Sequence, residues 1–208
     1  MKTIYFLRHA ECESNIKNAP YLGIDAKLTK KGIDDTKHLL PFFIDLNIDT
    51  IISSSAVRAV DTADIIAKSK KLSFVTTDLF LEREHPTELL GISHEDSYFS
   101  EVKQKVKKQL LQGKVFSDEE SFSDLCRRAD NFKSYLEQIS SGNILVVGHG
   151  RFSKFFLMYL GLGINFTPEI MLQIDSFTKS RNLGLSEVEY NETSQEWKLR
   201  QWNASIKI

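Results

Sequence analysis

The apolar run Ile4–Leu7, which ends directly in Arg8 and His9, constrains the fold of this chain more than any other segment. Continuous apolar runs of this length are typical of strands that are buried on both faces of a parallel sheet. Open α/β sheets place their chemistry just beyond the carboxyl ends of such strands. A guanidinium and an imidazole at that position indicate an anion site that also holds a nucleophile or a base.

The rest of the chain alternates strand-like apolar runs with segments of helical periodicity. Further strands are expected at 49–53, 74–76 and 143–148, and helices at about 29–44, 56–68, 95–112, 121–140 and 151–160. Pro41 interrupts the first helical pattern, so we expect that helix to kink or end nearby. Segments 184–190 and 196–202 alternate in polarity, which predicts antiparallel strands. This order predicts an α/β fold of three layers, α/β/α, around a mainly parallel central sheet.

Length and composition predict a single domain that binds neither nucleic acid nor a membrane. The 208 residues contain no internal repeat and no linker, so we expect one domain over 1–208 with a helical cap inserted over the active site at about 83–140. The formal net charge is −1, which leaves no global attraction for nucleic acid or anionic lipid. Any anion site must therefore be local.

The chain also lacks sequence signals for export, membrane insertion and disulfide bonding. No apolar stretch approaches the ~18 residues of a membrane span, and the N-terminal apolar run is too short for a signal peptide. Cys12 and Cys126 fit no disulfide framework and no zinc-ligand spacing. We therefore expect a cytoplasmic protein.

A second strand-like run ends as the first one does, with His149 and Gly150 following 143–148. Arg58 lies in the first turn of the helix expected after strand 49–53. Parallel strands would bring these residues to one edge of the sheet beside Arg8 and His9, where two arginines and the N–H groups of a helix start can bind a phosphoryl group. Taken singly, Arg58 could be a helix-surface residue and His149 a hydrogen-bonded strand-end residue. Their joint occurrence favours a functional site.

Several motifs along the chain, which include the residues of this site, together support a resemblance to a known family. They are Arg8-His9-Ala10-Glu11 with Asn15, Leu28–Gly32, Ser54–Ala63, Leu81–Pro86 and His149-Gly150. These motifs resemble the signatures of the histidine phosphatase superfamily, which has the phosphoglycerate-mutase-like fold, and the resemblance runs from Ile4 to about Trp202. It implies a phosphatase that hydrolyses phosphomonoesters through a phosphohistidine intermediate, with no cofactor and no metal.

The resemblance implies a role for each motif residue. His9 would attack phosphorus while a hydrogen bond, expected to a backbone carbonyl, holds its other ring nitrogen. The groups that would bind the phosphoryl oxygens are Arg8, Asn15, Arg58, His149 and Gly150. Glu82 would protonate the leaving alkoxide and then activate water, and Glu84 is the competing assignment.

Two alternatives to a phosphatase stay open. One is phosphoryl transfer of the phosphoglycerate mutase type. The other is a catalytically weak phosphate-binding scaffold, because Ala10 replaces the usual Gly and would be strained, and slow the reaction, if the position needed a positive φ. A Cys-dependent phosphatase is excluded, because the spacing that should lead from Cys12 to an Arg leads to Asn18. A metallohydrolase built on His9, His149 and Glu82 is disfavoured, because the flanking arginines would repel a divalent cation.

The substrate is expected to be a small phosphorylated metabolite or a phosphoprotein, and the protein a monomer or homodimer. Specificity is expected from loop 16–27 and the insertion 83–125. Lys103, Lys105, Lys107 and Lys108 lie on the helix expected at 95–112. The simpler interpretation of these lysines is a solvated helix face. The alternative is that part of this face borders the pocket and attracts a second anionic group.

Overall fold

The computed structural model describes residues 1–83, 85–140 and 142–207, and within them six strands form one sheet. The strands are β1 (Lys2–Arg8), β2 (Thr50–Ser54), β3 (Phe74–Thr77), β4 (Asn143–Gly148), β5 (Leu185–Asn191) and β6 (Glu196–Ala204). Their order across the sheet is β3-β2-β4-β1-β5-β6. The first four of these are parallel, whereas β5 and β6 run antiparallel at one edge. The expected mainly parallel sheet with two antiparallel strands from the tail is confirmed.

The helices largely follow the predicted periodic segments. They are α1 (Lys30–His38), α2 (Leu40–Asp45), α3 (Val57–Lys70), α4 (Ser97–Leu111), α5 (Phe122–Gln138), α6 (Gly150–Leu162) and α7 (Pro168–Phe177). Short 3-10 turns are η1 (Glu13–Asn15), η2 (Gly23–Asp25), η3 (Asp78–Phe80), η4 (Thr87–Leu89) and η5 (Gly163–Asn165). The expected break near Pro41 divides α1 from α2, and Pro41 lies in the first turn of α2, where no intrahelical N–H bond is lost.

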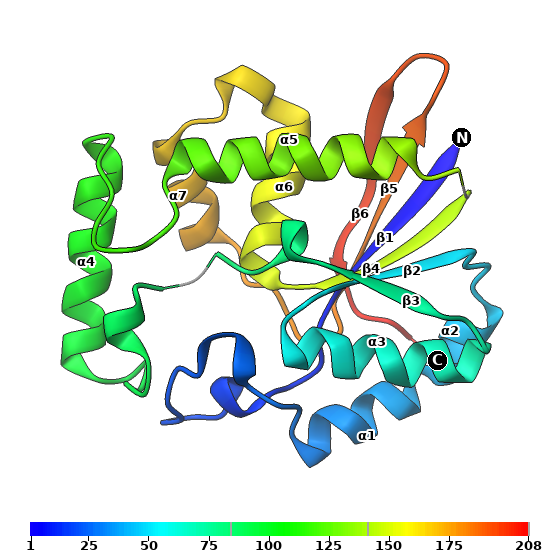
Figure 1. Ribbon diagram of the computed structural model, residues 1–208, viewed down its shortest axis with the longest axis horizontal. Coiled ribbons are helices and arrows are strands. Elements are labelled where there is room, and N and C mark those ends of the chain that lie inside the picture. Colours follow the sequence, from blue (N-terminus) through cyan, green and yellow to red (C-terminus); the bar gives the residue numbers. More distant parts are fainter. Residues whose placement is uncertain (84, 141, 208) are drawn as a thin grey trace.

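The sheet is the middle of three layers because its central strands bury both faces. Along β1, Ile4 and Phe6 contact the core that α5 and α6 cover, whereas Leu7 contacts the core beneath α1, α2 and α3. β4 alternates in the same way, with Ile144 on the first face and Leu145 on the second. This arrangement is visible in Figure 1, where α1, α2 and α3 lie below the sheet and α5 and α6 above it. The predicted α/β/α layering is confirmed.

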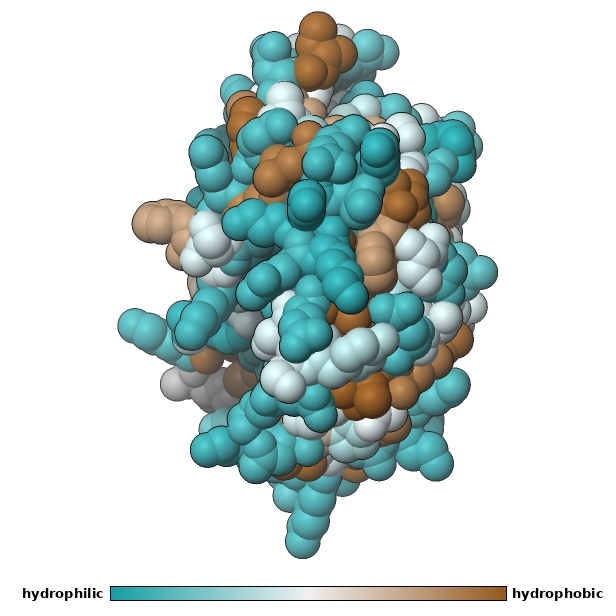
Figure 2. Space-filling view, turned by 90° about the vertical axis from the view of Figure 1, so that its left-hand side faces the viewer, coloured by the Kyte–Doolittle hydropathy of each residue, from teal (hydrophilic) through white to brown (hydrophobic). Residues whose placement is uncertain are grey.

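The part of the chain between β3 and β4 has two different environments. α5 packs into the main core through side chains such as Phe132. α4 lies away from the sheet on a small separate cluster that includes Phe99 and Val102, although Leu110 near its end joins the main core. The side of the molecule that α4 forms is largely hydrophilic (Figure 2). The single domain with a helical insertion at about 83–140 remains a prediction. Of the two helices in that predicted insertion, α4 is the one that lies away from the sheet.

Candidate active site

The register of β1 and β4 brings the two predicted histidines together. Arg8 lies opposite Gly148, and the backbone N–H of His9 donates to the carbonyl oxygen of Gly148 at 2.8 Å. The imidazole rings of His9 and His149 are therefore neighbours, with 5.4 Å between their centroids. Arg58 reaches them from the first turn of α3. These four residues meet at the carboxyl edge of the sheet, as the sequence predicts.

His9 is held as a neutral imidazole with a defined tautomer. Its Nδ1 lies 2.7 Å from the carbonyl oxygen of Ala10, so Nδ1 carries the proton and donates it. The Nε–H of Arg58 donates to Nε2 of His9 at 3.2 Å, which leaves the lone pair on Nε2. Burial, together with the charges of His149, Arg8 and Arg58, lowers the pKa of His9 well below its usual value. The structure thus places a carbonyl on the ring nitrogen where one was expected.

His149 is also buried and neutral, but one of its ring nitrogens has no partner among the described residues. Its Nε2 lies 2.8 Å from the hydroxyl oxygen of Ser54, whereas its Nδ1 is buried and accepts or donates no hydrogen bond within the described part of the chain. Burial and the charges of Arg58 and Arg8 lower the pKa of His149 well below its usual value. The Nε of Arg8 is a second buried group at this site that has no hydrogen-bond partner in the described residues. Such groups are costly to leave unsatisfied, and both suit an anionic ligand.

A segment after α7 braces the phosphoryl site, and no sequence pattern indicated it. The carbonyl oxygen of Ser180 accepts from Nη1 of Arg8 at 2.6 Å. The side-chain amide of Asn182 donates to the carbonyl of His9 and to Oδ1 of Asn15, each at 3.0 Å. Oδ1 of Asn15 also accepts from the N–H of Cys12 at 3.3 Å, so the amide nitrogen of Asn15 is left to donate.

Two glycines beside His149 allow this close packing. A Cβ on Gly148 would overlap the ring of Phe80, which lies just before the predicted acid Glu82. A Cβ on Gly150 would come within 2.8 Å of the Cβ of Ser180. Any larger residue at these positions would push away the segments that carry the acid and brace Arg8.

Glu82 lies at the N-terminus of α6 and lines the same pocket as His9. Its Oε1 accepts from the N–H groups of Phe152 at 2.7 Å and Arg83 at 3.1 Å, and its Oε2 accepts from the N–H of Arg151 at 3.1 Å. Three backbone N–H donors therefore hold the Glu82 carboxyl group in place at the start of α6. Glu84, the competing acid, lies outside the described residues.

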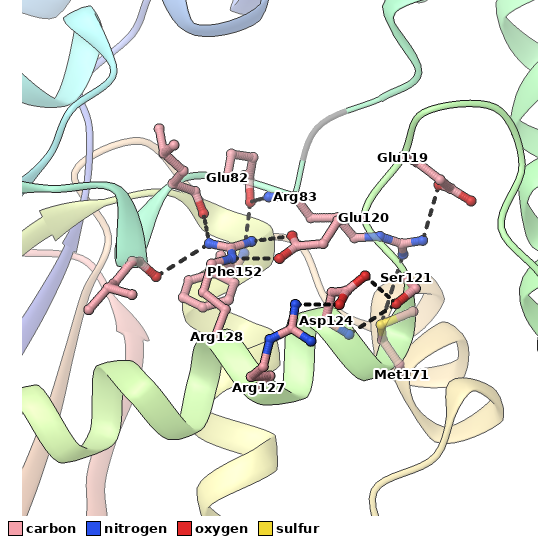
Figure 3. Close-up of polar contacts among 12 residues, drawn as sticks. Glu82, Arg83, Glu119, Glu120, Ser121, Asp124, Arg127, Arg128, Phe152 and Met171 are labelled. Atoms are coloured by element: carbon pink, nitrogen blue, oxygen red, sulfur yellow. Dashed lines mark hydrogen bonds and ion pairs between the residues drawn. The ribbon is translucent and has the colours of Figure 1, made fainter.

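Arg128 of α5 fixes the segment that carries Glu82, a role that the sequence did not reveal. Its guanidinium forms a two-pronged ion pair with Glu120, at 2.8 and 2.6 Å. It also donates to the carbonyl oxygen of Leu81 at 2.7 Å and lies 3.8 Å from the ring centroid of Phe152, whose N–H meets Glu82 (Figure 3). Arg128 thus contacts both sides of the Glu82 site.

The site opens into a cavity of about 640 Å³, which is the size of a metabolite site rather than that of a bare phosphate. Six of the predicted site residues line it, namely Arg8, His9, Asn15, Arg58, Glu82 and Gly150, and His149 lies buried behind His9. Among the residues that the structure describes, eight Lys or Arg side chains line the cavity, against the three acids Glu82, Glu119 and Asp175. The positive charge is therefore local, in a chain whose formal net charge is −1.

Other site types find no support in the part of the chain that the structure describes. Among residues 1–83, 85–140 and 142–207, no group of three or more His, Cys, Asp or Glu side chains is placed to hold a metal ion. Within the same residues, no helix has both the length and the apolar character needed to span a membrane. Burial raises the pKa of the Cys12 thiol, which opposes a thiolate nucleophile.

Comparison with known proteins places this chain in a family. The family model for the histidine phosphatase superfamily (branch 1) matches residues 4–205. A Citrobacter koseri protein named "Probable phosphoglycerate mutase GpmB" is 29% identical over 197 residues, which cover 93% of this chain and 87% of that protein.

Solved structures share the fold at lower identity. The phosphoserine phosphatase of Entamoeba histolytica, in complex with 3-phosphoglyceric acid, has a TM-score of 0.76 and 22% identity, and the match covers 99% of this chain and 98% of that one. The alpha-ribazole phosphatase of Shigella flexneri has a TM-score of 0.79 and 20% identity, with coverages of 99% and 98%. Because the family model spans nearly the whole chain, this protein belongs to the histidine phosphatase superfamily, branch 1.

Proposed function

We propose that this phosphatase hydrolyses phosphomonoesters by way of a phosphohistidine on Nε2 of His9. The observation that carries the proposal is the state of His9, a buried neutral imidazole whose Nδ1 is held by Ala10 and whose Nε2 lone pair faces Arg58. A nucleophile that is neutral at physiological pH and lies among arginines suits attack on a phosphate dianion.

In the first step, Nε2 of His9 forms a bond to phosphorus while the bond from phosphorus to the ester oxygen breaks. The Nε–H of Arg58 moves from Nε2 to a phosphoryl oxygen, and the partnerless Nε of Arg8 supplies another donor. Asn15, His149 and the N–H of Gly150 complete the set of donors. Protonated Glu82 gives its proton to the leaving oxygen, so the alcohol departs neutral and Glu82 becomes a carboxylate.

In the second step, water attacks phosphorus and the bond to Nε2 breaks. Glu82 accepts a proton from that water, so the products are hydrogen phosphate and a neutral His9 with its lone pair restored. This proton returns Glu82 to the acid form that the next first step needs. The three N–H groups that hold the Glu82 carboxylate keep it in place between the two steps.

Phosphoglycerate mutase activity is the second candidate, because the mutase relative matches 93% of this chain. A mutase would use the same phosphohistidine but transfer the group to a hydroxyl instead of to water. The scaffold alternative depended on strain at Ala10, and Ala10 is not among the non-glycine residues with positive φ in the described chain. We propose a small phosphorylated metabolite as the substrate, and a cytoplasmic location.

The test is turnover of p-nitrophenyl phosphate in EDTA, together with rapid acid and base quenching of enzyme labelled from a ³²P substrate. We expect turnover by the wild type, with protein-bound label that is acid-labile and base-stable. His9→Ala should lose both, whereas His38→Ala, a change on the exposed surface of α1, should keep both. Turnover without bound label at any time would overturn the phosphohistidine, and conversion of 3-phosphoglycerate to its isomer faster than to free phosphate would favour the mutase.

A further inference from the structure

Half of the described Lys and Arg side chains that line the cavity belong neither to the proposed phosphoryl site nor to an ion pair. Arg8 and Arg58 belong to the phosphoryl site, and the side chains of Arg83 and Lys154 pair with Glu119 at 3.4 Å and Asp175 at 2.7 Å. The four that remain are Lys103, Lys107, Arg151 and Lys179. Among the described residues, none of these four forms a close ion pair, although the charge of Asp175, the partner of Lys154, also acts on Lys103. Unpaired cations that face one cavity indicate an anionic ligand.

Lys103 and Lys107 face the cavity because of their place on α4. The α4 residues that line it are Lys103, Val106, Lys107 and Leu110. Their spacing of three, four and seven residues defines one face of the helix. Lys105 and Lys108 lie off this face and do not line the cavity, although all four lysines are exposed to solvent. A solvated helix face accounts fully for Lys105 and Lys108, whereas Lys103 and Lys107 also border the cavity.

Arg151 faces the same region from α6 and connects it to the phosphoryl site. The charge of Arg151 is one cause of the lowered pKa of Lys103, after burial, and it also lowers the pKa of His94 on the cavity wall. Arg151 and Lys103 therefore lie within electrostatic reach of each other, and Lys107 follows Lys103 by four residues on the same face of α4. The backbone N–H of Arg151 donates to Glu82, so this cluster lies beside the proposed proton donor. One small molecule can thus reach both the phosphoryl site and the cluster.

We propose that the substrate is a small phosphomonoester with a second anionic group, a carboxylate or a second phosphate, which Lys103, Lys107 and Arg151 bind. This proposal rests on the proposed phosphatase function and narrows its substrate class. The cavity of about 640 Å³ holds a molecule larger than the transferred group. An anion in this position relieves the repulsion among three cations that form no close ion pair among the described residues, which is the physical reason for the preference.

Matched substrates and matched variants test the second subsite. Glycerol 3-phosphate and 3-phosphoglycerate differ by a carboxylate, and fructose 6-phosphate and fructose 1,6-bisphosphate differ by a phosphate. The double variant Lys103→Ala/Lys107→Ala removes the cavity-facing charges, and Lys105→Ala/Lys108→Ala removes the same charge from the outer face of the same helix. KM and kcat are measured for the four substrates and for p-nitrophenyl phosphate.

We expect the wild type to have a lower KM for the doubly anionic member of at least one pair, and that pair identifies the second group. Loss of two charge-assisted contacts should raise that KM on the order of 10- to 100-fold in the cavity-facing variant. Substrates with one anionic group should change less than about 3-fold. The outer variant should change less than about 3-fold with every substrate.

Two results would overturn the subsite: no preference for a second anion in either pair, or equal effects of the two double variants. Failure of the phosphatase function gives a different result, namely no turnover of any of the five esters. Calorimetry can measure the subsite without turnover. The four esters of the two matched pairs are titrated into the His9→Ala protein, and into His9→Ala proteins that also carry one of the two double substitutions, and the Kd values are compared. Equal Kd values for the two members of each pair would likewise refute the proposal.

Discussion

Glu82→Gln should separate alkyl phosphates from aryl phosphates. An alkoxide is too basic to leave without a proton, and loss of a positioned acid should cost on the order of 10²- to 10⁴-fold in the phosphorylation rate of an alkyl substrate. p-Nitrophenolate leaves without protonation, so p-nitrophenyl phosphate should still phosphorylate His9. Because Glu82 is also the proposed base of the second step, the phosphoenzyme should then accumulate. A burst of nitrophenol followed by slow turnover is the expected trace.

The structure also gives the stability change of this variant. Glu82 accepts three N–H bonds, two on Oε1 and one on Oε2. A Gln carbonyl can keep the two at Oε1, but its NH₂ group would then face the N–H of Arg151 and could not accept from it. One unsatisfied donor and one lost charge at the start of α6 together cost about 1–3 kcal/mol. We expect a lower Tm by thermal denaturation, so kinetics should be compared well below it.

Equal losses with alkyl and aryl substrates would refute the reasoning, because they would indicate a structural defect at the start of α6. Glu88→Gln is the control, since this exposed carboxylate accepts from the hydroxyl of Tyr98 on α4 and should change neither rate. Glu84→Gln tests the competing assignment made from the sequence. If Glu84→Gln shows the leaving-group dependence and Glu82→Gln does not, Glu84 is the proton donor.

Three further predictions concern the groups around the nucleophile. Arg128→Met leaves the partly buried carboxylate of Glu120 unpaired and should lower the free energy of unfolding by about 3 kcal/mol. It should also reduce kcat more for alkyl than for aryl phosphates, whereas the exposed control Arg127→Met should change the free energy of unfolding by less than about 0.5 kcal/mol. His9 is neutral when folded but protonates near pH 6.5 when unfolded, so the unfolded state binds more protons. The contribution of His9 to stability should therefore fall by about 1.4 kcal/mol per pH unit below 6.5, and His149 should add to this slope in the same direction; His9→Gln should reduce the slope in urea titrations at pH 5 and 7.5. Ala10→Gly should leave kcat within about 2-fold and lower stability by about 1 kcal/mol, and a tenfold gain in kcat would contradict the unstrained backbone at this position.

The layers and the site edge could be predicted because both depend on local patterns. The apolar runs of β1 and β4 are buried on both faces, and a continuous apolar run by itself predicts a strand inside a parallel sheet. Once two parallel strands each end in a histidine, the shared edge follows from topology rather than from tertiary detail. Helix ends were also close, with 56–68 expected and Val57–Lys70 observed.

The helix and the site residues that were not predicted have weaker sequence signals. α7 was not predicted, although Thr167 and Pro168 form a recognisable start: the Thr167 hydroxyl accepts from the N–H of Ile170, and Pro168 opens the helix. Ser180 acts through its backbone carbonyl and Asn182 through contacts with residues more than 160 positions away, so neither leaves a local pattern.

The sequence around Arg128 contains a signal for an inward-facing side chain, but that signal alone does not establish the role of Arg128. It follows another arginine on an amphipathic helix, and composition does not distinguish them. Its position three residues after Leu125 and four before Phe132 puts it at the border of the buried face. That spacing could have indicated an inward guanidinium, but its partners Glu120 and Phe152 follow only from the fold.

Two motif residues that never meet the reacting atoms act through the backbone of the nucleophile loop. Thr62 accepts from the N–H of Ala10 at 3.1 Å and donates to the carbonyl of Arg58 at 2.7 Å, so it connects the loop of His9 to the helix that carries the arginine. Gly32 has no Cβ because one would overlap the carbonyl oxygen of Glu11. Ala10 contributes to this loop through its N–H and its carbonyl, both of which any residue supplies. Its methyl group replaces the usual glycine without strain, because the loop needs these backbone contacts and not a left-handed conformation.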